Sequence, residues 1–102
     1  MKAVINGKRY DTNTAELIGE YSSPGGYSAS YHLEESLFRT EKGQYFLAGA
    51  GGPLTKYAER ANPNCWRGGS AIILLSSSLA QLWAERHLSA EEVEANFKIE
   101  EG

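Results

Sequence analysis

The stretch Glu35–Gly52 constrains the fold more than any other part of this sequence. Two runs rich in aromatic and aliphatic residues flank a short polar segment, Glu41–Gly43. A three-residue hairpin loop ends in a residue with positive φ, and Gly43 stands where that residue is needed. The spacing therefore predicts a β-hairpin in which Leu37 faces Leu47.

Both faces of this predicted hairpin carry large apolar side chains. Phe38 and Phe46 share one face, whereas Leu37 and Leu47 share the other. A hairpin that is apolar on both faces is expected to be central in its sheet and covered, at least in part, on both sides.

The first arm, Tyr31–Thr40, also carries acid–base side chains. On a strand, His32 and Glu34 point to one face and Glu35 to the other. We expect Glu35 to be partly buried, with Arg39 on the same face as its simplest partner. His32 with Glu34 or Glu35 is the only compact acid–base group in the sequence, and the competing interpretation is a polar strip that faces solvent.

The segments around the hairpin predict further strands. Asn6-Gly7 is the strongest two-residue hairpin signal in the chain and predicts short strands on either side of it. Residues 14–22 fit either a strand or a helix, and Gly19 favours the strand. Residues 70–75 include four consecutive apolar side chains, which predicts a strand buried on both faces.

The C-terminal part predicts two short helices. Ser78 with Gln81, and Ser89 with Glu92, have the spacing of capping boxes. The apolar side of the first helix is predicted to consist of Leu79, Leu82 and Trp83. The chain is thus expected to form one α+β domain over residues 1–102, with a mainly antiparallel sheet of about five strands and the two helices packed on one face.

Three glycine- or proline-containing segments connect these elements. Residues 22–30 and 62–69 are predicted loops, and residues 54–61 are predicted to form a short helix or a turn. The segment Gly49–Gly52 follows a strand as a phosphate-binding loop would, but Pro53 and Leu54 stand where such a loop needs Gly-Lys-Ser/Thr. A tight turn is therefore expected there.

Several side chains are candidate protein contacts. Tyr27 lies in a predicted polar loop and either contacts a partner or folds back onto the sheet. Trp66 and Arg67 belong to the residue types enriched at interface hot spots, although Trp66 also suits a plug at the end of the core. The predicted protein-binding residues are Tyr27, Tyr31, Glu34, Trp66 and Arg67.

Composition narrows the classes of function. The net charge is −3, and residues 77–102 carry six acids against two bases, which argues against direct nucleic-acid binding. The single cysteine, Cys65, fits a reducing compartment and a small buried hydrophobe or loop anchor. No apolar run is long enough to span a membrane, and the first residues do not resemble the apolar region of a signal peptide, so we expect a cytoplasmic protein. We expect no metal or cofactor, because no such site is recognisable.

A family resemblance adds context. The residues Tyr10-Asp11-Thr12-x-Thr14-Ala15, the stretch from Glu35 to Leu47 and the pair Gly51-Gly52 resemble small uncharacterised proteins of bacterial phages and mobile elements. The resemblance covers about the first half of the chain, and its motifs are structural, so it carries no catalytic residue. It implies an inhibitor of host defence, of which anti-CRISPR proteins are one kind, that binds a protein surface.

These observations lead to one principal hypothesis and two alternatives. The principal hypothesis is a non-enzymatic inhibitor that blocks a host protein or nucleoprotein defence complex by steric occlusion. The first alternative is a small acid–base enzyme that uses His32 with Glu34 or Glu35. The second is an assembly module that forms a homodimer through an exposed strand edge.

Overall fold

The computed structural model describes residues 1–24 and 29–102. The principal sheet has four antiparallel strands in the order β3-β4-β5-β8: β3 (Glu16–Ser22), β4 (Leu33–Arg39), β5 (Tyr45–Gly51) and β8 (Gly69–Leu75). Two helices follow it, α1 (Ser77–His87) and α2 (Ala90–Asn96). The α+β class, the antiparallel sheet and the two C-terminal helices are therefore as predicted.

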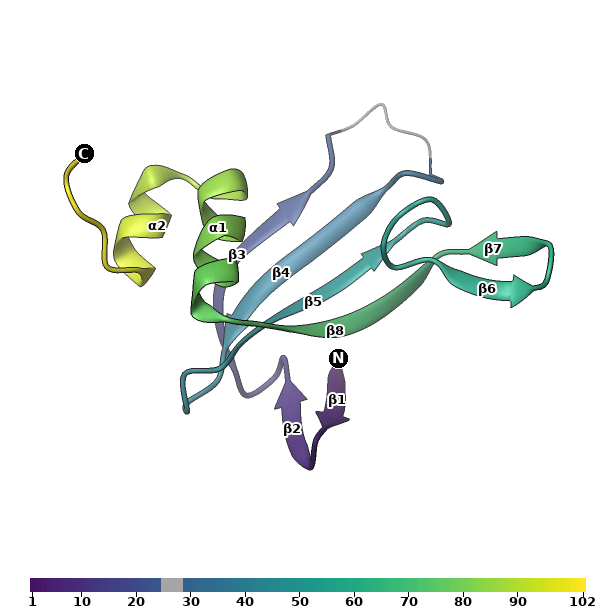
Figure 1. The fold of residues 1–102 in the computed structure, drawn as a ribbon, viewed down its shortest axis with the longest axis horizontal. Coiled ribbons are helices and arrows are strands. Elements are labelled where there is room, and N and C mark those ends of the chain that lie inside the picture. Colours follow the sequence, from purple (N-terminus) through teal and green to yellow (C-terminus); the bar gives the residue numbers. More distant parts are fainter. Residues whose placement is uncertain (25–28) are drawn as a thin grey trace.

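Four shorter strands form two separate hairpins. One hairpin pairs β1 (Lys2–Ile5) with β2 (Lys8–Asp11), and the other pairs β6 (Glu59–Asn62) with β7 (Cys65–Arg67). Figure 1 shows α1 and α2 at one end of the principal sheet and the β6–β7 hairpin projecting from the opposite end. The predicted loop over residues 62–69 is thus largely strand, and residues 54–58 form turns without a helix.

Local turn chemistry sets the two hairpins that the sequence predicted. Asn6 and Gly7 both have positive φ, as a two-residue turn of this kind requires. Gly43 has a φ of 88° and closes the β4–β5 turn, in which the Thr40 amide donates to the Gln44 carbonyl. The predicted register is confirmed, because Leu37 pairs with Leu47 along the ladder.

The two faces of the principal sheet are covered by different elements. On one face a core of buried side chains joins the strands to the helices, and it consists of Ile18, Leu37, Tyr45, Leu47, Ala80, Trp83, Ala84 and Val93. On the other face the β1–β2 hairpin packs Tyr10 edge-on against Phe46, with ring centroids 5.8 Å apart. Phe46 also stacks on Phe38, so both faces of the β4–β5 hairpin carry apolar contacts as predicted.

Helix α1 packs through a narrower stripe than the sequence suggested. Ala80 and Ala84 are fully buried and let the helix backbone approach the sheet, and Trp83 is buried between them. Leu79 and Leu82, predicted to share the buried side, are about half exposed. The helix also begins earlier than predicted, because Ser76 rather than Ser78 is the N-cap.

Helix α2 begins as predicted, whereas strand β8 is less buried than predicted. The capping box of Ser89 and Glu92 at the start of α2 is confirmed by both reciprocal hydrogen bonds. The prediction that residues 70–75 are buried on both faces is wrong, because β8 is an edge strand and its side chains are only partly buried or exposed. No helix in the described ranges, 1–24 and 29–102, is long and apolar enough to cross a membrane.

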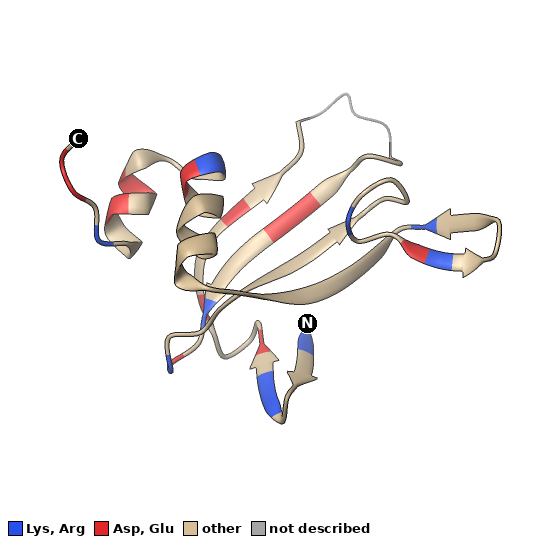
Figure 2. Ribbon diagram, viewed as in Figure 1, with Lys and Arg blue, Asp and Glu red and all other residues tan. Residues whose placement is uncertain are grey.

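Charge is unevenly distributed over these elements. Figure 2 shows acidic positions concentrated on α2 and the C-terminal segment, whereas basic positions mark the β1–β2 hairpin. The two regions lie in different parts of the molecule (Figure 2), so the acidic C-terminal part is separated from the basic β1–β2 hairpin.

Candidate binding groove

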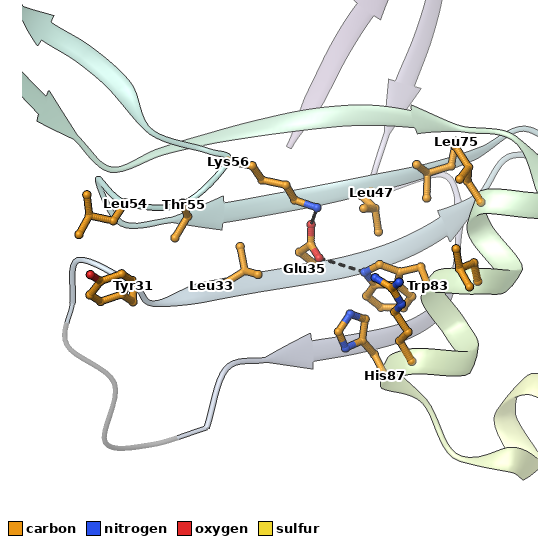
Figure 3. A pocket seen from close by; sticks show the side chains of 13 residues that line it. Tyr31, Leu33, Glu35, Leu47, Leu54, Thr55, Lys56, Leu75, Trp83 and His87 are labelled. Carbon is orange, nitrogen blue, oxygen red and sulfur yellow. Dashed lines mark hydrogen bonds and ion pairs between the residues drawn. The ribbon is translucent and has the colours of Figure 1, made fainter.

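An open groove of about 520 Å³ lies on the helix-bearing face of the principal sheet. Its floor is formed by β4 and β5, one wall by α1, and the opposite wall by the segment that follows β5 (Figure 3). The lining residues are Tyr31, Leu33, Glu35, Leu47, Leu54, Thr55, Lys56, Leu75, Leu79, Leu82, Trp83, Arg86 and His87. The helices cover only one end of the sheet, which leaves this face open beyond Trp83 (Figure 3).

A buried carboxylate lies at the floor of the groove. The Glu35 side chain is 2% exposed and accepts hydrogen bonds from three groups on two other segments. The Trp83 indole Nε1 donates to Oε1 at 3.0 Å, and the Tyr57 hydroxyl donates to Oε2 at 2.6 Å. The Lys56 Nζ lies 2.6 Å from Oε2 and completes a charge-assisted pair (Figure 3).

These contacts set the ionisation of the groove. Burial by itself raises the pKa of Glu35, but the hydrogen bonds from Lys56, Tyr57 and Trp83 and the Lys56 charge outweigh it, so the pKa is lowered. Burial, followed by the hydrogen bond to the Glu35 carboxylate, raises the pKa of Tyr57 well above its ordinary value. Glu35 is therefore a carboxylate and Tyr57 a neutral phenol at neutral pH.

Glycine at position 49 makes this arrangement sterically feasible. A Cβ atom at Gly49 would collide with the Tyr57 ring and hydroxyl. The tyrosine thus lies flat against the backbone of β5, and its hydroxyl reaches the Glu35 carboxylate on β4. Gly52 has a similar role at the end of the same segment. A Cβ atom there would collide with the Ala29 carbonyl, so glycine allows the two backbone segments to approach closely.

The expected partner of Glu35 is wrong. Arg39 instead pairs with Glu16, which lies opposite it on β3, and its guanidinium lies 5.9 Å from the centre of the Tyr45 ring. Cross-strand pairing directs Arg39 towards the sheet edge, whereas Lys56 reaches Glu35 from a segment distant in sequence. No local spacing indicated that contact.

His87 lies at one end of the groove, between two aromatic rings. Its ring is 4.0 Å from that of Tyr21 and 5.1 Å from that of Trp83, measured between centroids. Burial lowers the pKa of His87; the Glu35 charge opposes this, and the charges of Arg86 and Lys56 add to it. The imidazole is therefore predominantly neutral at pH 7 and acts as a packing group.

The rim of the groove gathers exposed apolar side chains. Four of the large apolar side chains that face solvent line this one groove, each between 45% and 59% exposed: Tyr31, Leu54, Leu79 and Leu82. Scattered single apolar residues are normal on a protein surface, but four exposed ones that line the same groove are typical of a binding site. Arg86 adds a positive charge to this rim, whereas the charge of Lys56 is matched by the Glu35 carboxylate.

The predicted contact residues do not form one site. Tyr31 lines the groove, whereas Glu34 lies on the opposite sheet face and pairs with His32 at 3.0 Å, both side chains being exposed. Tyr27 lies outside the described residues. Trp66 and Arg67 lie on β7, in the projecting hairpin.

The β6–β7 hairpin presents Trp66 to solvent. This side chain is 51% exposed and lies 5.0 Å beneath the Arg60 guanidinium, so the interpretation of Trp66 as a core plug is wrong. Arg67 pairs with Glu59 at 3.3 Å on the facing strand. Cys65 is exposed rather than buried, because a three-residue strand in a two-stranded hairpin has no second layer to cover it.

Sequence reasoning missed Leu54, Lys56 and Arg86. Leu79 and Leu82 were recognised as apolar, but not as exposed. Within the described part of the chain, no group of three or more histidine, cysteine or acidic side chains could hold a metal ion. No family model, curated protein or solved structure matches the chain.

Proposed function

We propose that this chain is a non-enzymatic protein-binding module that inhibits a bacterial defence complex by covering one of its protein surfaces in the cytoplasm. The observation that carries the proposal is the groove on the helix-bearing face, rimmed by Tyr31, Leu54, Leu79 and Leu82 in half-exposed positions. Exposed apolar side chains that border a concave surface supply the buried centre of a protein interface. The choice of a defence complex as target rests on the resemblance to phage and mobile-element proteins.

The chemistry of the groove favours a segment that is apolar with flanking acidic groups. The half-exposed leucines of the rim and Tyr31 offer an apolar surface for one or two side chains of the partner. Lys56 and Arg86 lie in the lining, and the Glu35 charge is already matched by Lys56. A partner carboxylate beside its apolar side chain would therefore meet a favourable potential at Arg86.

The β6–β7 hairpin offers a second contact. Trp66 and Arg67 project beyond the end of the principal sheet, and neither is needed to cover the core. A hairpin of this kind can enter a cavity of a large complex while the groove holds a neighbouring segment. Two contact regions on one small domain suit steric occlusion.

The acid–base alternative has less support. Both oxygens of Glu35 already accept hydrogen bonds, and the lowered pKa makes it a poor proton donor. His32 and Glu34 form an exposed pair on the sheet face opposite Glu35. A general acid–base group would be expected to converge with these carboxylates in one cleft.

The test compares the intact chain with a groove variant. The tagged protein and its Leu82→Glu variant are used to recover partners from an extract of bacteria that carry a nuclease-based defence system. Val4→Glu is the matched control, because Val4 is 71% exposed and is not part of the groove. We expect the intact chain and Val4→Glu to recover a nuclease or nucleic-acid-binding complex, and Leu82→Glu to lose it.

The same three proteins are then expressed in cells challenged with phage. The proposal predicts that the intact chain and Val4→Glu restore phage plating, whereas Leu82→Glu does not. Recovery of no such complex by the intact chain, or equal activity of the Leu82→Glu variant, would refute the proposal.

A further inference from the structure

The outer edge of β8 lacks the features that usually protect an edge strand against pairing with another chain. β8 is the last strand of the order β3-β4-β5-β8, so one side pairs with β5 and the other faces outward. It has seven residues and contains neither proline nor a charged side chain. The sequence carries no charged residue from Gly68 to Ala84. Soluble proteins usually guard long edges with charges, proline or bulges.

The opposite edge of the same sheet is guarded in these ways. On β3, Glu16 and Glu20 are exposed, and a bulge interrupts the register between Leu17 and Gly19. The principal sheet therefore has one open edge and one closed edge.

The hydrogen-bond alternation shows which groups of β8 point outward. The Thr40 amide donates to the Gln44 carbonyl at the β4–β5 turn, so even-numbered residues of β5 bond to β4 and odd-numbered residues bond to β8. The β5–β8 register pairs odd with odd, as in Leu47 with Ile73. The amide and carbonyl groups of Ser70, Ile72 and Leu74 therefore point away from the sheet.

We propose that β8 pairs antiparallel with β8 of a second copy of this chain, across a two-fold axis at Ile72. In this register Ile72 faces its own counterpart, and Ser70 faces the partner's Leu74. All three outward amides and all three outward carbonyls of each copy are then paired. The two principal sheets become one continuous sheet of eight strands.

Three features favour a second copy as the occupant. The outward-pointing residues are symmetric about Ile72, so the edge is complementary to itself in the register with the greatest overlap. No like charges oppose each other across the axis, since β8 carries none. Because the principal sheet of each copy has a single unguarded edge, pairing of these sheets closes at two chains and does not continue into a fibre.

The first test measures the mass of the purified chain. Light scattering coupled to size exclusion is performed over a wide range of concentration, and we expect a species of twice the 11.2 kDa chain mass at the upper end. A single-chain mass at every concentration up to the high micromolar range would overturn the proposal.

Two variants at the centre of the edge locate the contact. Ile72→Pro removes an outward amide that the chain itself does not use, and proline is tolerated on an edge strand in that orientation. Ile72→Lys places two positive charges face to face across the axis. Both variants are expected to be monomeric, whereas Glu20→Lys, which places the same side chain on the closed edge, stays dimeric. Dimers that persist in both Ile72 variants overturn the proposal.

Hydrogen exchange on the intact chain provides a readout that does not depend on variants. The amides of Ser70, Ile72 and Leu74 are expected to exchange slowly at high concentration and faster on dilution, although they face outward within one chain. Rapid exchange of these three amides in a dimeric sample would place the interface elsewhere and overturn the proposal. Pairing of this edge with a strand of another protein, in a chain that never self-associates, would also overturn it.

Discussion

At the scale of single residues, Glu35 links three parts of the chain that are distant in sequence. It lies on β4, and its carboxylate accepts from the segment after β5 and from α1. All its buried polar neighbours depend on it, because removing the carboxylate leaves their donors without an acceptor. A buried donor that loses its acceptor usually destabilises the folded state by more than the net contribution of the hydrogen bond to stability.

Replacement of Glu35 by alanine tests this dependence. The indole Nε1 of Trp83 and the hydroxyl of Tyr57 would be left buried without an acceptor. We expect the free energy of unfolding, measured by urea denaturation, to fall by about 3 kcal/mol. Glu34→Ala, at the exposed neighbouring position, is expected to change it by less than about 0.5 kcal/mol. Equal effects of the two substitutions would contradict this role for Glu35.

The lowered pKa of Glu35 predicts acid sensitivity. The unfolded state binds the proton more readily than the folded state, so the stabilisation is complete above the unfolded pKa of about 4.5 and is lost as the pH falls through the folded pKa. Urea denaturation at decreasing pH should show this loss below about pH 4.5. In the Glu35→Gln variant, the free energy of unfolding should fall less over this pH range. An unchanged dependence on pH would contradict the assignment of the acid sensitivity to Glu35.

The lowered pKa of His87 predicts a second loss of stability on acidification, which begins at a higher pH than the loss caused by Glu35. Burial lowers its pKa in the folded state, so the unfolded state again binds the proton more readily. The contribution of neutral His87 is present above the unfolded pKa of about 6.5 and decreases as the pH falls below that value.

The His87→Phe variant keeps an aromatic ring between Tyr21 and Trp83 but cannot be protonated. Between about pH 7 and pH 5, its stability should depend less on pH than that of the intact chain. His32→Gln is the control, because it removes the exposed histidine and leaves His87 in place. A variant with the same pH dependence as the intact chain would refute this prediction.

At the scale of secondary-structure elements, the burial of the two tryptophans distinguishes helix α1, which is part of the core, from the projecting β6–β7 hairpin. Trp83 on α1 is 7% exposed and belongs to the core cluster, whereas Trp66 on β7 is about half exposed. The first packs α1 on the sheet, and the second lies outside the core, with the Arg60 guanidinium over its ring. The two elements should therefore respond differently to the loss of the same side chain.

Alanine substitutions measure this difference directly. Trp83→Ala should lower the free energy of unfolding by about 3–5 kcal/mol, because it leaves a core cavity and removes a hydrogen bond to Glu35. Trp66→Ala should cost about 1 kcal/mol or less, which is the scale of an exposed cation–π contact. Thermal denaturation followed by circular dichroism is sufficient to compare them. A Trp66→Ala loss as large as that of Trp83→Ala would mean that the β6–β7 hairpin supports the core.

The elements also show how far the sequence alone determines the structure. The β4–β5 register follows from a three-residue loop and its glycine, and the start of α2 follows from Ser89 and Glu92, so short-range chemistry was sufficient for both. The N-cap Ser76 was missed because three consecutive serines, 76–78, offer equivalent caps. Only packing against the sheet distinguishes among them.

The groove could not be predicted in the same way. Lys56 and Trp83 meet at Glu35, and no periodicity relates residues so far apart along the chain. The exposure of Leu79 and Leu82 depends on which stripe of α1 faces the sheet, and the small side chains of Ala80 and Ala84 determine that choice. Helical spacing predicted an apolar side but not its orientation.

At the scale of the whole molecule, the open edge and the rimmed groove both involve β8 but use different groups of it. The edge offers outward backbone groups of Ser70, Ile72 and Leu74, whereas the groove offers side chains that include Leu75 and Leu79. A dimer formed through β8 would carry two grooves related by a two-fold axis. For the binding function proposed above, such a dimer would bind a complex with repeated subunits more tightly than one copy does, because the second contact becomes intramolecular.

Dimer formation through β8 predicts that thermal stability depends on protein concentration. Association stabilises the folded state only, so the midpoint of unfolding rises as more chains pair. For the intact chain, Tm measured by circular dichroism should increase steadily between dilute and concentrated samples, whereas the Tm of Ile72→Pro should stay constant. The variant keeps every hydrogen bond between β5 and β8, so its principal sheet should remain intact and the concentration dependence of Tm is the quantity to compare. A concentration-dependent Tm in Ile72→Pro would show that the chains associate through another surface.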